Sequence, residues 1–294
     1  MARLKIVLAM FAFGTLGPFI KNIPLPSSEI ALYRGVIALL VLAVFLFASG
    51  RARKQAFAWR QLGILFLSGM AMGLNWVLLF EAYRHTSVAL ATLSYYFAPT
   101  AVVLGSALFF RESLRPAQLI CFAASTAGVV LIIGVSGARG GSDLVGVLFG
   151  LGAALLYASV VMGNKAAGSM DGVTRTLLQF LAAVLVLVPY VALTGGFHLG
   201  GLPISGWAPL LIVGVVHTGI MYLLYFSAIP KVKGQQAAIL SYIDPLVAVA
   251  ISVFWLRETM SPLQWTGGAM ILIFTLLNET VFAAAISPQN REPA

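Results

Sequence analysis

Residues 94–118 read SYYFAPTAVVLGSALFFRESLRPAQ, and residues 241–264 read SYIDPLVAVAISVFWLRETMSPLQ. The two stretches are versions of one element. Identical residues recur at a constant offset of 146 positions, pairing Pro99 with Pro245, Arg111 with Arg257, Glu112 with Glu258, Pro116 with Pro262 and Gln118 with Gln264. Identities at one offset indicate an internal repeat, which must be recognised before a fold is assigned. The sequence therefore predicts two copies of one structural unit.

The composition indicates that most of this chain lies in lipid. Of its 294 residues, 60% are hydrophobic and 9% are charged, whereas an ordinary soluble domain has roughly 25% charged residues. A bilayer-spanning helix needs roughly 20 mostly apolar residues. We expect an all-α integral membrane protein with ten transmembrane helices, at about 4–21, 27–48, 60–83, 87–110, 116–135, 144–165, 172–193, 206–229, 235–256 and 262–284.

Basic residues in the connections predict the orientation of these spans. With the N-terminus inside, thirteen Lys and Arg residues fall on the inner side and four on the outer side. Connections rich in Lys and Arg stay in the cytoplasm, so we expect both termini to be cytoplasmic. The net charge of +9 is then loop charge, and nucleic acid is not expected as a partner.

Each copy of the repeat has an odd number of spans, so the second copy must enter the membrane upside down. We predict two inverted five-helix repeats, at residues 1–139 and 140–286, followed by a disordered tail at 287–294. Inverted repeats are a common plan in secondary transporters, whose substrates bind near the midplane where the repeats meet. Channels can also carry inverted repeats, so the repeat by itself does not identify a transporter.

Two prolines fall near the centres of the fourth and ninth spans. Pro99 and Pro245 each remove a backbone donor and free the carbonyl four residues earlier, on Tyr95 and Ser241. A free carbonyl at membrane depth must find a partner or line a wet cavity. Both copies show the feature, which favours a cavity, although a kinked helix with a satisfied carbonyl is the alternative.

Charged residues inside the spans are candidate functional groups, because such residues are expensive in a bilayer. Asp244 precedes Pro245 and is a candidate for proton coupling or for binding an amino group; hydrogen bonding to hydroxyls such as that of Ser241 is the structural alternative. Arg34 and Glu81 are expected at similar depth, and we interpret them as a structural ion pair, with a clamp for a substrate carboxylate as the alternative.

Aromatic and polar side chains are expected to line a substrate pocket. Tyrosine hydroxyls in particular need a partner when buried. The cavity candidates are Asn75, Trp76, Tyr83, Tyr95, Tyr96, Pro99, His217, Tyr222, Tyr225, Ser241, Tyr242, Asp244 and Pro245. His217 alone is better interpreted as a satisfied interior histidine than as a proton relay. Glu112 and Glu258 follow arginines at span ends, and we interpret these pairs as local interfacial features.

Several functional classes are not supported by the sequence. It contains no paired catalytic carboxylates, nucleophile elbow, metal-binding histidine motif or phosphate-binding glycine loop. Cys121 is the single cysteine and cannot form an intrachain disulfide. We therefore expect neither an enzyme nor a cofactor or metal site.

The motifs resemble those of a known family. These are ALYRG (31–35), FEAY (80–83), TS (86–87) and FRE (110–112), with Pro99, Gln118 and GV (128–129). The chain resembles the drug/metabolite transporter superfamily in its ten-helix EamA-type branch, and among its members the bacterial aromatic amino acid exporters of the inner membrane. Many members have Trp-Gly where this chain has Phe13-Gly14, so no role of that tryptophan is carried over.

The resemblance implies export of small metabolites by alternating access. We expect a bacterial inner-membrane exporter of neutral amino acids, aromatic ones included, whose partners are a small-molecule substrate and the lipid bilayer. The alternatives are a carrier of drugs or other metabolites with the same fold, and a passive channel. The sequence leaves the coupling ion and the oligomeric state open, with a monomer as the simplest case.

Overall fold

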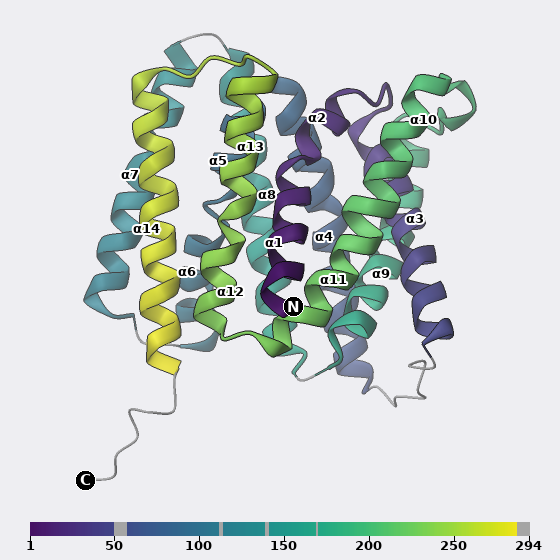
Figure 1. Ribbon diagram of the computed structural model, residues 1–294, viewed down its shortest axis with the longest axis horizontal. Coiled ribbons are helices and arrows are strands. Elements are labelled where there is room, and N and C mark those ends of the chain that lie inside the picture. Colours follow the sequence, from purple (N-terminus) through teal and green to yellow (C-terminus); the bar gives the residue numbers. More distant parts are fainter. Residues whose placement is uncertain (50–57, 112–113, 139–140, 169, 287–294) are drawn as a thin grey trace.

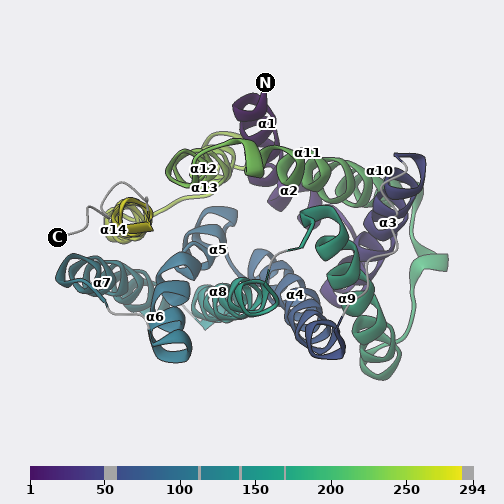
Figure 2. The same cartoon turned by 90° about the horizontal axis from the view of Figure 1, so that it is seen from below.

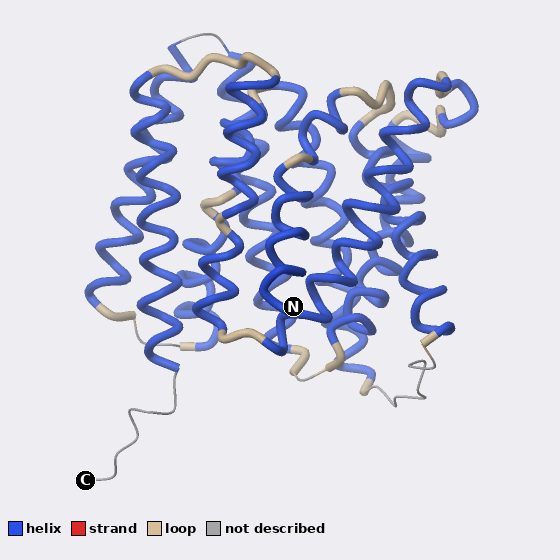
Figure 3. The backbone as a smooth tube through the Cα atoms, viewed as in Figure 1, coloured by secondary structure: helices blue, strands red, loops and turns tan. Residues whose placement is uncertain are grey.

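The computed structural model describes residues 1–49, 58–111, 114–138, 141–168 and 170–286. Across these residues the chain is helical, with short connections and no strand (Figures 1 and 3). The helices are α1 (Ala2–Gly14), α2 (Leu16–Lys21), α3 (Ser27–Ala48), α4 (Trp59–His85), α5 (Val88–Tyr95), α6 (Ala98–Phe110), α7 (Pro116–Ala138), α8 (Gly141–Ala166), α9 (Gly172–Thr194), η1 (Leu199–Gly201), α10 (Ile204–Leu211), η2 (Ile212–Ile220), α11 (Met221–Ala228), η3 (Ile229–Lys231), α12 (Gly234–Ser241), α13 (Ile243–Ala250), η4 (Ile251–Trp255) and α14 (Pro262–Ile286).

These helices confirm an all-α membrane protein. Within the described ranges, eight helical segments are long and apolar enough to cross a bilayer, and 239–255 forms a shorter apolar helix. With α14 they correspond to the ten predicted spans. Several spans are broken, so the first comprises α1 and α2, the fourth α5 and α6, the eighth α10, η2 and α11, and the ninth α12, α13 and η4.

The chain runs across the bundle in both senses. The start of α1 and the end of α14, which are the first and last described parts of the chain, lie toward one edge of the molecule, whereas α7 ends and α8 begins at the opposite edge (Figure 1). The first span of the first half therefore begins at the edge that carries the termini, whereas the first span of the second half begins at the other edge. This arrangement agrees with the predicted inverted fold.

Local geometry repeats at the offset that the sequence shows. Arg111 and Arg257 both have a φ of 54°, in the left-handed region that residues other than glycine rarely adopt. The side-chain oxygens of Gln118 and Gln264 each accept a hydrogen bond at 2.9 Å from the backbone N–H three residues earlier. Each glutamine thus caps the start of its helix, α7 or α14, in the same way. Glu112 and the tail 287–294 lie outside the described residues.

Small residues bring helices of the two halves together. A Cβ atom built on Gly128 of α7 would lie 2.6 Å from the carbonyl oxygen of Gly267 on α14, and one on Gly267 would lie equally close to that of Gly128. Such close backbone contact is how helices associate in lipid, where apolar side chains gain little from burial.

Seen from below, α13, α1 and α11 form a row that faces α5, α8 and α4 (Figure 2).

Candidate functional site

The fourth and ninth spans both break where the repeat aligns them. α5 ends at Tyr95 and α12 ends at Ser241, which are the two positions whose carbonyls the prolines were expected to free. Pro99 then follows the start of α6, and Pro245 follows the start of α13. Each proline therefore lies in the first turn of a new helix, where a missing backbone donor is tolerated.

Arg34 on α3 is held by two neighbouring elements and is 4% exposed. Its Nε donates to the Thr218 hydroxyl on η2 at 2.7 Å. Its guanidinium carbon lies 4.6 Å from the ring centre of Trp76 and 5.4 Å from that of Phe80, both on α4. Such cation–π contacts contribute about 2 kcal/mol each when desolvated. Among the described residues, no carboxylate forms an ion pair with Arg34.

The predicted Arg34–Glu81 pair is therefore wrong. The carboxylate of Glu81 lies 3.7 Å from the imidazole of His85, one turn further along α4, and keeps 30% of its side chain exposed. Trp76 and Phe80 lie four positions apart on the face of α4 that meets Arg34. Glu81 is the next residue after Phe80, and successive helical residues are rotated by about 100°, so it points elsewhere.

Asp244 contacts the first half of the chain through Tyr96. The Tyr96 hydroxyl lies 2.9 Å from a carboxylate oxygen of Asp244 and 3.1 Å from the Ser241 carbonyl oxygen. The carbonyl that Pro245 deprives of its helical donor thus meets a donor from the fourth span. The Ser241 carbonyl and the Asp244 carboxylate share one hydroxyl donor, so the freed carbonyl has a polar neighbour from the other half of the chain.

The backbone of Asp244 also lies against the first span. A Cβ atom on Gly14 would be 2.5 Å from the Asp244 carbonyl oxygen and 2.7 Å from Cβ of Val247. Real Cβ atoms do not come this close, so only glycine allows α1 to lie directly on α13 at this point. Gly14 therefore fixes the position of Asp244 relative to the first half.

Six tyrosines from both halves lie within contact or electrostatic range of one another in the interior. We call Tyr95, Tyr96, Tyr157, Tyr222, Tyr225 and Tyr242 the tyrosine cluster. Ring centres are 6.2 Å apart for Tyr95 and Tyr96, 5.7 Å for Tyr95 and Tyr157, and 5.9 Å for Tyr96 and Tyr242. These are the edge-to-face spacings that aromatic rings prefer.

Two members of the tyrosine cluster connect the two charges. The phenols of Tyr95 and Tyr222 lie within electrostatic range of both Arg34 and Asp244. The ring of Tyr222 also contacts Phe13 at 5.3 Å and Phe180 at 5.4 Å between centres. The structure thus places a cation, a carboxylate and a set of phenols in one interior region.

The predicted cavity residues divide into two groups by exposure. Tyr95, Tyr96, Pro99, Tyr222, Tyr225, Ser241 and Asp244 keep partly accessible surface, whereas Asn75, Trp76, Tyr83, His217, Tyr242 and Pro245 are buried. The partly accessible group includes most of the tyrosine cluster and Asp244.

Asn75 and His217 both have interior partners. Asn75 donates to the Ala153 carbonyl at 2.6 Å. His217 lies 2.8 Å from the Thr15 hydroxyl through Nε2 and 3.3 Å from the Ile212 carbonyl through Nδ1. These contacts agree with the interpretation of His217 as a satisfied interior histidine.

The prediction that Glu258 is a local interfacial feature is wrong. One of its carboxylate oxygens pairs with the Lys21 ammonium at the end of α2. The other accepts from the Val88 backbone N–H at 2.8 Å and from the Ser252 hydroxyl at 2.5 Å, and Ser252 in turn accepts from the Ala89 N–H at 3.1 Å. We call these five residues the Glu258 clasp. It joins the first, fourth and ninth spans, which no residue pattern in one span could have indicated.

Sequence reasoning also missed three other groups. Thr218, the partner of Arg34, lies on η2, a wider helical turn in which its hydroxyl donates to the Val213 carbonyl five residues earlier at 2.7 Å. Such segments are frequent at functional sites. Tyr157 belongs to the tyrosine cluster, but no regularly spaced aromatic residues accompany it in the sequence of its span, so it was not predicted. Glu279 on α14 has a buried carboxylate oxygen without a partner, and a charged residue within a predicted span was a signal that could have found it.

Comparison with known proteins establishes the family. The model of the EamA-like transporter family matches residues 1–134 and again residues 144–280. The chain belongs to the EamA-like transporter family. The two matches cover the two halves that the internal repeat delimits.

Relatives of this EamA-like protein are transporters. It is 31% identical over 279 residues to the uncharacterized transporter YxxF of Bacillus subtilis, covering 92% of this chain and 86% of that protein. It is 24% identical over 208 residues to the threonine/homoserine exporter RhtA of Escherichia coli, covering 70% and 66% of the two chains. A solved crystal structure shares the fold with a TM-score of 0.63 at 21% identity, over 96% of this chain and 98% of that one. The protein is a multi-pass membrane transporter and not an enzyme.

Proposed function

We propose that this EamA-like transporter exports neutral amino acids, aromatic ones among them, by alternating access. The observation that carries the proposal is the unpaired state of two opposite charges. Within the described part of the chain, Arg34 and Asp244 form no ion pair with each other or with another residue. Both charges lie near the same phenols, those of Tyr95 and Tyr222.

A zwitterion complements such a pair of charges. Its carboxylate matches the planar donor set of an arginine guanidinium, and its ammonium group matches a carboxylate. A buried charge without an opposite charge to pair with is unfavourable, so a ligand that neutralises both charges at once gains more than a ligand with a single charge. Arg34 thereby takes the role of the carboxylate clamp, and Asp244 the role of the ammonium site.

The tyrosine cluster suits the side chain of an amino acid. Aromatic rings provide apolar faces on which aliphatic and aromatic side chains pack, while their hydroxyls bind polar atoms. This combination favours neutral amino acids of differing size over strongly charged ones. The similarity to RhtA, which is named as a threonine/homoserine exporter, points to the same substrate class.

The orientation of the transporter is part of the proposal. We infer that the edge that carries both termini faces the cytoplasm of a bacterial cell, because the connections on that side hold most of the basic residues. The repeats 1–139 and 140–286 then move relative to each other to expose the region between Arg34 and Asp244 to one side at a time.

Counterflow in proteoliposomes tests the substrate assignment. Vesicles loaded with unlabelled threonine, methionine or phenylalanine are diluted into trace labelled amino acid, and transient accumulation of label reports exchange. We expect exchange by the wild type and at least tenfold slower exchange by Asp244→Asn. Glu81→Gln is the matched control, because Glu81 is an acid on a neighbouring span that contacts neither Arg34 nor Asp244. Absence of exchange by folded wild-type protein for all three amino acids would refute the assignment.

A further inference from the structure

The Glu258 clasp lies at one face of the bundle only. Lys21 ends α2, Val88 begins α5 and Glu258 follows η4, and these ends meet at the edge away from the two termini (Figure 1). The clasp thus connects two spans of the first half to the ninth span of the second half. Lys21 and Glu258 keep 30% and 17% of their side chains exposed, so the pair is partly shielded from water.

Backbone geometry directs the Glu258 side chain toward α5. Arg257 takes a left-handed φ of 54°, and the Glu258 backbone N–H donates to the Ser252 carbonyl at 3.0 Å. The chain therefore turns back over the end of η4 and presents the carboxylate to the first backbone N–H of α5, that of Val88. Negative charge is favoured at a helix start, where the peptide dipoles point their positive ends.

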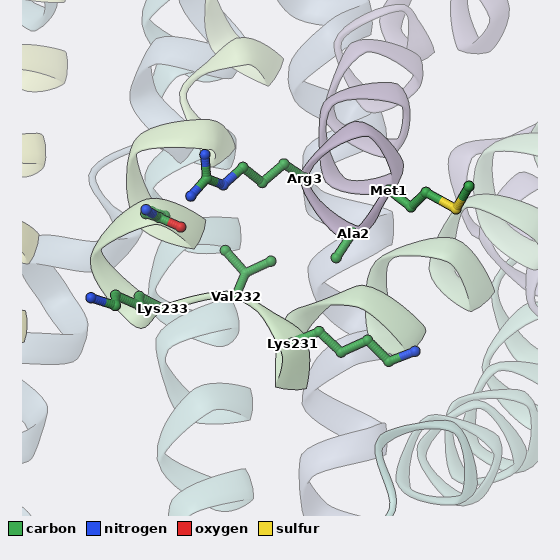
Figure 4. A pocket seen from close by; sticks show the side chains of 7 residues that line it. Met1, Ala2, Arg3, Lys231, Val232 and Lys233 are labelled. Atoms are coloured by element: carbon green, nitrogen blue, oxygen red, sulfur yellow. The ribbon is translucent and has the colours of Figure 1, made fainter.

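The ends of the first and ninth spans flank a pocket at the opposite face. A pocket of about 600 Å³ lies between the start of α1 and the connection from η3 to α12, lined by Met1, Ala2, Arg3, Lys231, Val232, Lys233 and Gln236 (Figure 4). The first and ninth spans therefore meet through charge-assisted hydrogen bonds at one face, and a pocket lies beside their ends at the face that carries the termini.

We propose that Glu258 is a gating residue, which closes the transport path at the face away from the termini and must leave Lys21 and α5 before substrate can pass there. A transporter that works by alternating access needs its path closed at one face while the other face is open. The clasp joins the two halves at one face in this way, which fits a state closed away from the termini. This inference rests on the transport activity of the family and does not depend on which substrate is carried.

Thiol labelling within the clasp tests the gate. Ala89 is fully buried and its N–H donates to the Ser252 hydroxyl of the clasp, so Ala89→Cys in a Cys121→Ser background places a small buried reporter within the clasp. The protein is held in lipid nanodiscs, where both faces are open to a membrane-impermeant maleimide and orientation does not matter. We expect slow labelling with Glu258 present, and at least fivefold faster labelling with Glu258→Gln, because the charge that binds Lys21 and the start of α5 is removed.

Glu29→Gln is the matched control at the same face. Glu29 binds the imidazole and the backbone N–H of His198 at 2.6 and 2.8 Å, so its loss does not touch the first, fourth or ninth span ends. Lys21→Met provides a second variant, which removes only the cation and is expected to speed labelling as well. Equal labelling rates in the reporter protein and both clasp variants would overturn the proposal, and so would an equal increase in the Glu29→Gln control. Gel filtration of each variant excludes unfolding as the source of faster labelling.

Discussion

Tyr96 and Tyr242 offer a test of the interior polar contacts, because they occupy equivalent positions in the repeat but differ in their partners. The Tyr96 hydroxyl meets the Asp244 carboxylate and the Ser241 carbonyl at 2.9 and 3.1 Å. The Tyr242 hydroxyl is buried and has no hydrogen-bond partner in the described part of the chain. The same substitution to phenylalanine should therefore have opposite effects at the two positions.

We expect Tyr96→Phe to lower the free energy of unfolding by about 1.5–3 kcal/mol, which is the range for a hydrogen bond to a charged group. The single O–H proton can serve one acceptor at a time, so the two contacts do not add. Tyr242→Phe should be neutral or stabilising, by up to about 1 kcal/mol, because it removes a buried polar group that forms no bond.

Reversible unfolding in mixed micelles measures both variants side by side. A double-mutant cycle of Tyr96→Phe with Asp244→Asn should give a coupling energy of roughly 0.5–3 kcal/mol, as expected for side chains in direct contact. A Tyr242→Phe variant that loses as much stability as Tyr96→Phe, or a cycle without coupling, would refute the assigned contacts.

Three further predictions test other parts of the structure. Gly14→Ala should separate α1 from α13 and destabilise the protein by about 1–3 kcal/mol through overpacking, with amino acid exchange falling as well; unchanged unfolding and exchange would contradict the close contact with Asp244. Gly267→Ala should destabilise by a similar amount, about 1–3 kcal/mol, at the contact with Gly128, whereas Gly63→Ala, which meets no neighbour, should be neutral in the same unfolding assay. Glu279→Gln should raise the apparent melting temperature, because it neutralises a carboxylate with one buried oxygen that has no hydrogen-bond partner among the described residues. A lower melting temperature would contradict this assignment.

Features with a period or a repeat could be predicted from the sequence. The apolar runs predict the spans, since length and composition alone decide whether a helix can cross a bilayer. The 146-residue offset predicts the equivalent breaks before Pro99 and Pro245 and the equivalent helix caps at Gln118 and Gln264. Each span, helix break and helix cap is determined by residues that are close together in the sequence, so it can be recognised without knowing how the spans pack.

Side-chain partners across spans could not be predicted in this way. Arg34 was paired with Glu81 on the basis of depth alone, but depth does not determine which face of a helix a residue occupies. Glu258 was assigned a local role because its partners, Lys21 and Val88, are separated from it by at least 170 positions. Only the packing of the spans brings these groups together.

Amino acid exchange by purified protein tests the central proposal most directly. Proteoliposomes with wild-type protein should accumulate labelled threonine, methionine or phenylalanine by counterflow, and variants that remove either charge, Arg34→Gln or Asp244→Asn, should exchange at least tenfold more slowly. Undiminished exchange in both variants would contradict a substrate site between Arg34 and Asp244.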